Sequence, residues 1–311
     1  RVGGQVLVLF PFKKDKRLDF AGFVTSVNLE AGEELAVQGS LKNLVFEIKD
    51  SKLKVTESLS GKDLKDFKAI YIRRLKAKTQ EKVTAVSIAA KKWSISVINS
   101  ENSNLQSFSK LTELVALSLD NLPVPDTIIA AKSEIKAMLQ NGEWWLPFPL
   151  IMKDANGSVG SKNYLVKNKK ELRGILNLEQ NKDCIFIYQQ MIPNDGDYRF
   201  LITGDKIGVV IHRSAVEGDH RNNTSLGAAA SLTSEEDLCL NIRNDAINAA
   251  KALDRELCGV DVLIDKETGK HYILEVNKKT MLDEGAFIPY KMRAVSEFFK
   301  NYEEFKLNFK E

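Results

Sequence analysis

The sequence CGVDVLIDKETGKHYILEVN, residues 258–277, contains two strand-like runs separated by a short polar segment that carries Gly269. Apolar residues that alternate on both sides of a glycine-bearing turn predict an antiparallel hairpin. One face of this hairpin is expected to be buried, because successive side chains of a strand point to opposite faces. The residues predicted to face the core are Val260, Val262, Tyr272, Leu274 and Val276.

The opposite face of the predicted hairpin carries carboxylates. If Asp265 and His271 face each other across the turn, counting back along both strands places Asp261 opposite Glu275. Asn277 points the same way as Glu275, because side chains alternate. Two carboxylates about 5 Å apart repel each other unless a cation or a proton lies between them, and oxygen ligands favour Mg²⁺. The alternative is a solvated hairpin whose acidic residues face water.

A second stretch, HRSAVEGDHRNNTSLGAA at residues 212–229, gathers arginines, acids, amides and glycines but almost nothing that can form a core. Arginine binds planar anions through two-pronged hydrogen bonds. Anionic substrates brought close together need such a group of polar side chains to neutralise their charge. This stretch is therefore predicted to be an anion-binding site.

The stretch IMKDANGSVGSKNYLV, residues 151–166, places Lys153 at the end of a predicted strand, before a loop that carries Gly157 and Gly160. Glycines let backbone N–H groups approach an anion and the lysine adds a point charge, so the loop can close over phosphates. The spacing matches neither a P-loop nor a Rossmann fingerprint. An ordinary glycine-bearing hairpin is the alternative interpretation.

The rest of the chain alternates between strand-like and helix-like segments, which predicts an α/β organisation for the first ~100 residues. A helix is expected from Lys110 to Leu119, and another from Lys132 to Asn141, where Gly142 ends it. Residues 99–109 are rich in serine and asparagine and mark a domain edge. Strands are expected within residues 5–10, 43–48, 52–58, 67–75, 91–99, 121–130 and 146–154, the second and third forming a hairpin.

The 311 residues predict two domains or three small ones. With 43% hydrophobic and 28% charged residues the composition is that of a soluble globular protein, and no apolar run is long enough to cross a membrane. The net charge of +3 is well mixed along the chain, so neither a nucleic-acid nor a membrane partner is expected. The start lacks signal-peptide features and the three cysteines form no disulfide or zinc pattern, which predicts a cytoplasmic protein.

The order of these segments resembles the ATP-grasp ligases, and among them the ribosomal-protein glutamate ligase (RimK-like) branch. The most specific match is RSAVEGDHRNN, residues 213–223, which looks like the family's R-x-A-x-E-G-D-F-R-x-N, together with the GVD and LEVN of the hairpin. The resemblance runs from about Lys110 to Arg293 and implies an α/β (α+β) ATP-grasp fold. It implies an N-terminal α/β domain at 1–108, a central subdomain at 109–192 and a C-terminal antiparallel-sheet subdomain at 193–311.

The resemblance also assigns residues to three roles. The metal ligands would be Asp261, Glu275 and Asn277. The catalytic residues would be Arg221, Arg213 and Arg199. The residues that bind ATP would be Lys110, Lys153, Gly157, Ser158, Gly160, Gln190, Met191, Asp197, Arg221, Asn222 and Asn223.

Within the ATP-binding set, Lys153 would contact the phosphates, Gln190 and Met191 the adenine, and Asp197 the ribose. Among the arginines, Arg199 would face the phosphate or the acyl group. Arg221 and Asn223 would bind the phosphoryl group in transfer. Arg213 would hold the acceptor carboxylate or the acyl phosphate.

The activity implied by the resemblance is that of an ADP-forming carboxylate–amine ligase that uses ATP and Mg²⁺, with Mn²⁺ as an alternative metal. A substrate carboxylate would attack the γ-phosphate, and an amine would then displace phosphate to form an amide. The substrates would be an amino acid, a peptide or a protein end, and homo-oligomerisation is left open. The alternatives are a peptide-cyclising ligase of a modified-peptide pathway and a catalytically silent nucleotide-binding regulator.

Three places depart from the family pattern or match it only loosely. Where the family has N-A-S-P-G after the metal strand, residues 277–281 read Asn-Lys-Lys-Thr-Met. Where it has R-G-G after the polar stretch, residues 226–228 read Leu-Gly-Ala, so a preference for glutamate is not implied. Arg73 and Arg74 resemble the strand end of peptide-modifying relatives, where arginines meet a peptide, and the alternative is a plain surface pair.

Overall fold

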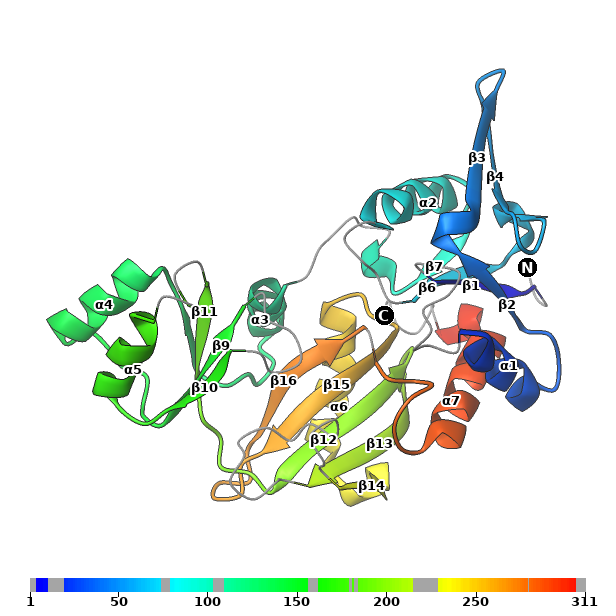
Figure 1. Ribbon diagram of the computed structural model, residues 1–311. Coiled ribbons are helices and arrows are strands. Elements are labelled where there is room, and N and C mark those ends of the chain that lie inside the picture. The colour runs from blue at the N-terminus through cyan, green and yellow to red at the C-terminus, as the bar shows by residue number, and fades with distance from the viewer. Residues whose placement is uncertain are drawn as a thin grey trace.

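The computed structural model describes residues 4–10, 20–73, 79–102, 109–155, 162–178, 181, 184–214, 229–278 and 280–305. The strands in these ranges form two four-stranded sheets, one five-stranded sheet and one three-stranded sheet (Figure 1). Parallel pairing is confined to the N-terminal sheet and the others are antiparallel. The architecture is therefore the mixed α/β (α+β) class expected from the sequence.

The N-terminal part contains β1 (Val6–Phe10), β2 (Ala36–Ser40), β6 (Ala69–Ile72) and β7 (Ser96–Ile98), with helices α1 (Phe20–Ala31) and α2 (Gln80–Lys92). Its parallel sheet has the order β2-β1-β6-β7. All of β1 is buried, as a strand covered on both faces requires. Short 3₁₀ turns η1 (Leu41–Asn43), η2 (Leu64–Asp66) and η4 (Ser100–Asn102) complete this part.

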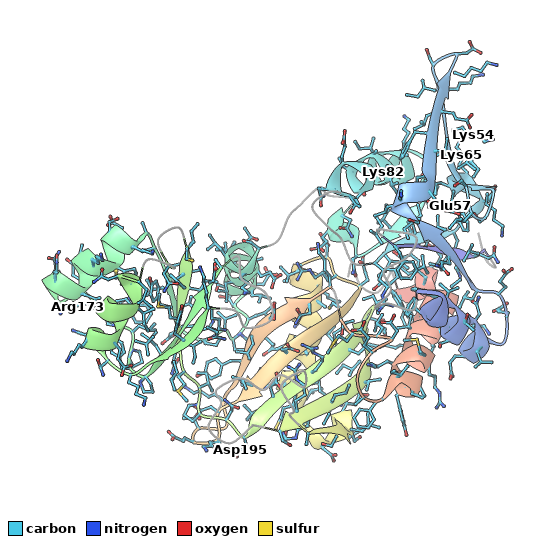
Figure 2. The ribbon with its side chains drawn as sticks, in the orientation of Figure 1. Lys54, Glu57, Lys65, Lys82, Arg173 and Asp195 are labelled. Atoms are coloured by element: carbon cyan, nitrogen blue, oxygen red, sulfur yellow. The ribbon has the colours of Figure 1, made fainter. Side chains whose placement is uncertain are left out.

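A hairpin of β3 (Leu44–Lys49) and β4 (Lys52–Glu57) projects from the N-terminal part and pairs with β5 (Lys62–Asp63), which confirms the predicted hairpin (Figure 1). Figure 2 shows Glu57 at its base and Lys54 farther along it. The buried Glu57 carboxylate accepts hydrogen bonds from the N–H groups of Leu59 and Ser60 at 3.0 and 2.8 Å. These bonds fix the turn that returns the chain to the parallel sheet.

The central part contains α3 (Lys110–Leu119), β8 (Thr127–Ile129), α4 (Lys132–Asn141), β9 (Leu150–Asp154), β10 (Asn163–Val166), α5 (Lys169–Leu176) and β11 (Phe186–Gln190). Both predicted helices are confirmed: Ser109 and Thr112 form a capping box at the start of α3, and Gly142 ends α4 in a left-handed conformation. The sheet has the order β10-β9-β11-β8 and shares a core with α4 and α5. Figure 2 shows Arg173 of α5 at the outer edge of this part.

The C-terminal part contains β12 (Gly196–Thr203), β13 (Lys206–Ser214), β14 (Ala230–Thr233), η7 (Glu235–Asp237), α6 (Leu240–Ala252), β15 (Leu257–Ile264), β16 (His271–Asn277) and α7 (Ile288–Lys300). The sheet is antiparallel in the order β14-β13-β12-β15-β16. Phe200 and Val260 on one face pack with α6, whereas Leu201 and Leu257 on the other pack with α7. The two helices therefore cover opposite faces.

The β15–β16 hairpin confirms the predicted strands but corrects their register. His271 pairs with Ile264 rather than with Asp265, and a β-bulge next to Asp261 brings the chain back into the pairing of Asp261 with Glu275. The one-residue shift at the turn and the bulge offset each other, so the predicted pairing of Asp261 with Glu275 is confirmed. The bulge also changes the buried face: Ile273 is buried against α6, while Tyr272 and Leu274 are only partly covered.

Helix α7 packs against both the N-terminal and the C-terminal sheet (Figure 1). Phe299 of α7 contacts Tyr71 of β6 edge to face, with ring centroids 5.8 Å apart. The same core includes Phe23 of α1 and Leu201 of β12. The N-terminal and C-terminal parts thus share one hydrophobic core, although each also has a second one. In the central part, α4, α5 and their sheet have a core of their own, whereas Leu117 of α3 packs in the C-terminal core with α6.

Within the described ranges, no helix has both the length and the apolar character needed to span a membrane.

Candidate active site

A row of alternating charges crosses the α7-covered face of the five-stranded sheet. Arg199 on β12 lies opposite Asp261 on β15, and its Nε and Nη2 donate to the two carboxylate oxygens at 2.7 and 2.6 Å. Asp197, on the same face of β12, accepts a hydrogen bond from Nε of Arg213 on β13 at 2.8 Å. Arg213 Nη2 also lies 3.3 Å from Asp261 Oδ2. Cross-strand register therefore joins two arginines and two aspartates in one network.

Burial and charge oppose each other in this network. Burial raises the pKa of a carboxyl group, but the guanidiniums of Arg199 and Arg213 hold the pKa of Asp261 below its ordinary value. Burial raises the pKa of Asp197 to about 6, because Arg213 offsets only part of the desolvation and Asp261 adds repulsion. The Asp197 side chain accepts hydrogen bonds from Arg213, and the ribose contact predicted for it stays a prediction.

The three predicted metal ligands lie together at the β16 end of this row. Asn277 Nδ2 is 3.3 Å from both Asp261 Oδ2 and Glu275 Oε2. The guanidiniums of Arg199 and Arg213 lie beside Asp261 and offset its charge, and its role as a metal ligand stays a prediction. Among the described residues, no group of three or more His, Cys, Asp or Glu side chains is arranged to hold a metal. Two carboxylates and an amide nevertheless fit Mg²⁺, which completes its shell with waters and phosphates.

Two lysines face the metal-ligand group from the central part. Lys153 at the end of β9 donates to Gln189 Oε1 on the adjacent β11 at 2.6 Å, and Lys110 of α3 donates to the Asp154 carbonyl at 3.3 Å. Burial lowers the pKa of Lys153 to about 8, with Glu275 opposing the shift and Lys110 adding to it. The two lysines and Glu275 are therefore close enough to interact electrostatically. Gln189, the partner of Lys153, has no sequence motif that would have identified it.

The segment after β11 connects the central and C-terminal parts. Gln190 lies at the end of β11, where its backbone N–H donates to the Asp126 carbonyl at 2.8 Å. Gln190 and Met191 are both partly buried, and their contact with adenine stays a prediction. Beyond them, Lys266 in the β15–β16 turn donates its backbone N–H to the Pro193 carbonyl at 3.0 Å. Its ammonium lies 3.4 Å from Asp195, which Figure 2 shows at the edge of the molecule.

Several predicted site residues lie outside the described residues. They are Gly157, Ser158 and Gly160 of the phosphate loop and Arg221, Asn222 and Asn223 of the polar stretch. Their roles stay predictions. Arg74 also lies outside, whereas Arg73 is 2% exposed, so for Arg73 the surface-pair alternative was wrong.

A buried arginine that no motif indicated supports the site from behind. Arg255 is 1% exposed, donates to Glu101 at 2.9 Å and to Glu113 of α3 at 2.8 Å, and also donates to the carbonyl of Val276. Val276 lies between Glu275 and Asn277, so Arg255 fixes the strand end that carries both. In the sequence it is a single arginine in an ordinary polar segment, and only its tertiary contacts identify it.

A pocket opens beside the charged row. It is lined by Arg199 and Arg213 of the sheet, by Lys291 of α7, and by residues of the segment between β16 and α7, namely Thr280, Met281, Glu284, Gly285 and Ala286. Apolar side chains of the sheet complete the lining, namely Leu201, Ile211 and Ala230. The pocket thus joins cationic groups to an apolar wall, directly after the strand end at which the sequence departs from the family pattern.

Comparison with known proteins agrees with this arrangement. A family model described as the RimK-like ATP-grasp domain matches residues 107–286. A probable alpha-L-glutamate ligase of Shewanella loihica is 30% identical over 57% of this chain and 58% of its own length. A second, from Vibrio atlanticus, is 29% identical over 72% of both chains.

Solved structures show the same fold at 14% identity. The macrocyclase MdnC of Microcystis aeruginosa, bound to precursor peptide MdnA, has a TM-score of 0.67 and covers 96% of this chain and 100% of that one. The ATP-grasp ligase PsnB, complexed with precursor peptide PsnA2 and AMPPNP, also has a TM-score of 0.67, with 96% and 99% coverage. The predicted ATP-grasp fold and ligase class are confirmed at the level of the family, because the family model covers more than half of the sequence. The chain belongs to the RimK-like ATP-grasp family.

Proposed function

We propose that this protein is an ADP-forming ligase that joins a carboxylate to an amine. The observation that carries the proposal is the arrangement of cations around the oxygen ligands. Lys110 and Lys153 approach Glu275 from the central part, while Arg199 and Arg213 lie on the sheet beside Asp261. A triphosphate and a carboxylate brought together carry several negative charges, and cations on two sides can neutralise them.

In the proposed reaction, a carboxylate oxygen of the substrate attacks the γ-phosphorus of ATP and the bond to ADP breaks. The amine nitrogen then attacks the carbonyl carbon of the acyl phosphate, phosphate leaves, and the nitrogen loses a proton to give the amide. The residues mainly position the reactants and stabilise charge, so no covalent nucleophile of the protein is needed. Arg199 and Arg213 would hold the acyl phosphate, and Lys153 and Lys110 the phosphates of ATP.

A divalent metal fits the oxygen ligands of the hairpin. Glu275 and Asn277, together with Asp261, would hold Mg²⁺. When bound, the metal would neutralise phosphate charge and orient the leaving group. Because Asp261 is also held by two guanidiniums, Glu275 would be the main anionic ligand.

Two substrate classes are compatible with the comparisons. The curated relatives are named glutamate ligases, which supports addition of an amino acid to a peptide or protein end. A second candidate, the joining of side chains within a precursor peptide, is supported because solved ligases complexed with precursor peptides align with 94–96% of this chain, including its N-terminal part. A silent nucleotide-binding regulator would bind ATP without turnover.

An ADP-release assay tests the proposal. The protein would be incubated with MgATP and a panel of amino acids and short acidic peptides, and the products would be weighed by mass spectrometry. Addition of an amino acid raises the peptide mass by one residue, whereas internal joining lowers it by one water. The Glu275→Gln variant serves as the control for contaminating ATPase. Nucleotide binding with no substrate-dependent ADP release across the panel would leave the silent regulator as the function.

A further inference from the structure

The pocket beside the charged row has a second wall that does not come from the sheet. Residues Met281, Glu284, Gly285 and Ala286 line it together with the arginines of the sheet. This segment joins β16 to α7 and belongs to neither. Something other than strand pairing must therefore hold it in place.

Lys291, in the first turns of α7, is one holding contact. It is 5% exposed, and its ammonium donates to the carbonyl oxygens of Met281 and Glu284, each at 2.6 Å. Because one ammonium bonds the carbonyls of both Met281 and Glu284, it fixes the backbone between these two residues. Burial lowers the pKa of Lys291 to about 8, with Asp283 opposing the shift and Arg199 and Arg73 adding to it.

Arg73 is the second holding contact, and it comes from the N-terminal part. It follows directly after β6, is 2% exposed, and forms an ion pair with Asp283 in the middle of the same segment. Its guanidinium also lies over the ring of Phe23 on α1, 4.1 Å from the centroid. The guanidinium is buried and lies on an aromatic ring, so Arg73 has little freedom to move and holds Asp283 in a fixed position.

We infer that Arg73, Asp283 and Lys291 are positioning residues that let the N-terminal part set the shape of the substrate pocket. They fix the wall formed by residues 281–286 and thereby decide which carboxylate or amine substrate fits, without contacting the nucleotide. This inference rests on the ligase function proposed above. It gives the N-terminal part a role in substrate selection through the same α7 contact that builds the shared core.

The test compares Asp283→Asn and Lys291→Met with a matched control, Lys68→Met. Lys68 precedes β6, is 9% exposed, and donates to the carbonyl of Lys300 at 3.5 Å. It therefore links the same strand and helix at the ends remote from the pocket. Arg73→Lys keeps the charge and serves as the conservative variant.

The first readout is amide hydrogen exchange of the full chain, which needs no substrate. Exchange in residues 281–286 should rise about tenfold in Asp283→Asn and Lys291→Met, less in Arg73→Lys, and not in Lys68→Met. The second readout uses whichever substrate gives ADP release. Its KM should rise about tenfold in the same variants, while the KM for MgATP stays within about twofold.

The two readouts separate the two claims. Unchanged exchange in residues 281–286, or an equal increase in Lys68→Met, overturns the inference whatever the catalytic result. A KM for MgATP that rises in parallel with the substrate KM also overturns it, because the residues would then act on the whole site. If no substrate supports ADP release in the wild type, the ligase function fails, while the exchange result still decides whether these residues hold the wall.

Discussion

At the scale of single residues, Asp261 and Glu275 differ although they face each other across the hairpin. Asp261 is the counterion of Arg199 and Arg213, whereas no arginine is paired with Glu275 among the contacts described above. Removal of a buried carboxylate that guanidiniums bond destabilises the fold, because the cations lose their partner. A carboxylate with no arginine partner is available to a metal cation. We therefore propose that Asp261 serves mainly as the counterion of the arginines and Glu275 mainly as a metal ligand.

This difference predicts unequal effects of two isosteric variants. Glu275→Gln should lower ADP formation by about a hundredfold or more and leave unfolding by urea nearly unchanged, because it removes a charged metal ligand. Asp261→Asn should also lose activity, but at a cost of about 3–5 kcal/mol in the free energy of unfolding, because Arg199 loses the carboxylate that both its Nε and Nη2 bond, and Arg213 is left with Asp197. Equal stability of the two variants in urea would contradict the assignment of Asp261 as the counterion.

The lowered pKa of Lys153 predicts how nucleotide binding depends on pH. In the folded protein the ammonium is present below a pH of about 8 and is lost above it, although an exposed lysine titrates near 10.5. Because the ammonium is the form that attracts phosphate, affinity for MgATP should be level below that pH and fall by up to about tenfold per unit above it.

Titration calorimetry across this pH range checks the prediction. Lys153→Met should bind more weakly and show no fall in affinity. Lys291 has a similarly lowered pKa but contacts the pocket wall instead, so Lys291→Met should retain the wild-type pH profile. A profile that persists in Lys153→Met would assign the titration to another group.

At the scale of secondary-structure elements, Arg255 connects three segments that no sheet joins. Its guanidinium donates to Glu101 of η4, to Glu113 of α3 and to the carbonyl of Val276 in β16. Helix α3 also carries Lys110, three residues before Glu113 and so on the same side of the helix. One arginine thus fixes the position of the helix that carries Lys110, a predicted phosphate-binding residue, relative to the strand that carries the predicted metal ligands.

Removing part of this junction should weaken the site more than the fold. Glu113→Gln takes one carboxylate from a partly exposed position, so we expect a loss of about 1–2 kcal/mol in stability and a several-fold higher Mg²⁺ requirement for ADP formation. Arg255→Met should cost about 3–5 kcal/mol, because the buried Glu101 then keeps only Lys278 among its described cations and Glu113 loses its guanidinium partner.

A control exists at the opposite end of the same strand. His271 of β16 lies 2.8 Å from Asp245 of α6, and Asp245→Asn should change the Mg²⁺ requirement little. The measurements are chemical denaturation and ADP formation as a function of Mg²⁺ concentration. If Asp245→Asn and Glu113→Gln shift the Mg²⁺ requirement equally, Arg255 has no special effect on the site.

At the scale of the whole molecule, the shared core means that the N-terminal and C-terminal parts should unfold together. Phe299 is fully buried between them, and truncation to alanine removes packing on both sides at a cost of about 3–5 kcal/mol. In hydrogen exchange, Phe299→Ala should therefore accelerate exchange in β1 and β6 as well as in β12.

Leu172 of α5 provides the matched core variant in the central part. It is also fully buried, but its neighbours belong to the separate core of α4, α5 and their sheet. Leu172→Ala should accelerate exchange in β9 and β11 and spare β1. Uniform acceleration by both variants would show instead that the molecule opens as one cooperative unit.

The local sequence was sufficient for the elements and for part of the site. Helix α3 and the end of α4 follow from a capping serine and a glycine, and β1 from an unbroken apolar run. Alternation along two adjacent strands predicted the carboxylate pair of the hairpin, although only because the shift at the turn and the bulge beside Asp261 offset each other. Such signals depend on neighbours within a few residues, and these are visible in one sequence.

Contacts between residues far apart in the sequence could not be predicted from such local signals. Arg73 and Asp283 are 210 positions apart, and Arg255 and Glu113 are 142 apart. An arginine that pairs with any of many carboxylates looks the same in the sequence, and the partner is fixed only when sheets and helices pack. The sequence alone therefore determined many of the elements, the family resemblance and the pairing of Asp261 with Glu275. Only the tertiary structure decided that guanidiniums offset the charge of Asp261 and that Arg73 of the N-terminal part bonds the pocket wall, because these contacts depend on which charges are buried together. Only the tertiary structure also decided that α7 packs against both the N-terminal and the C-terminal part, because this contact depends on which apolar faces meet.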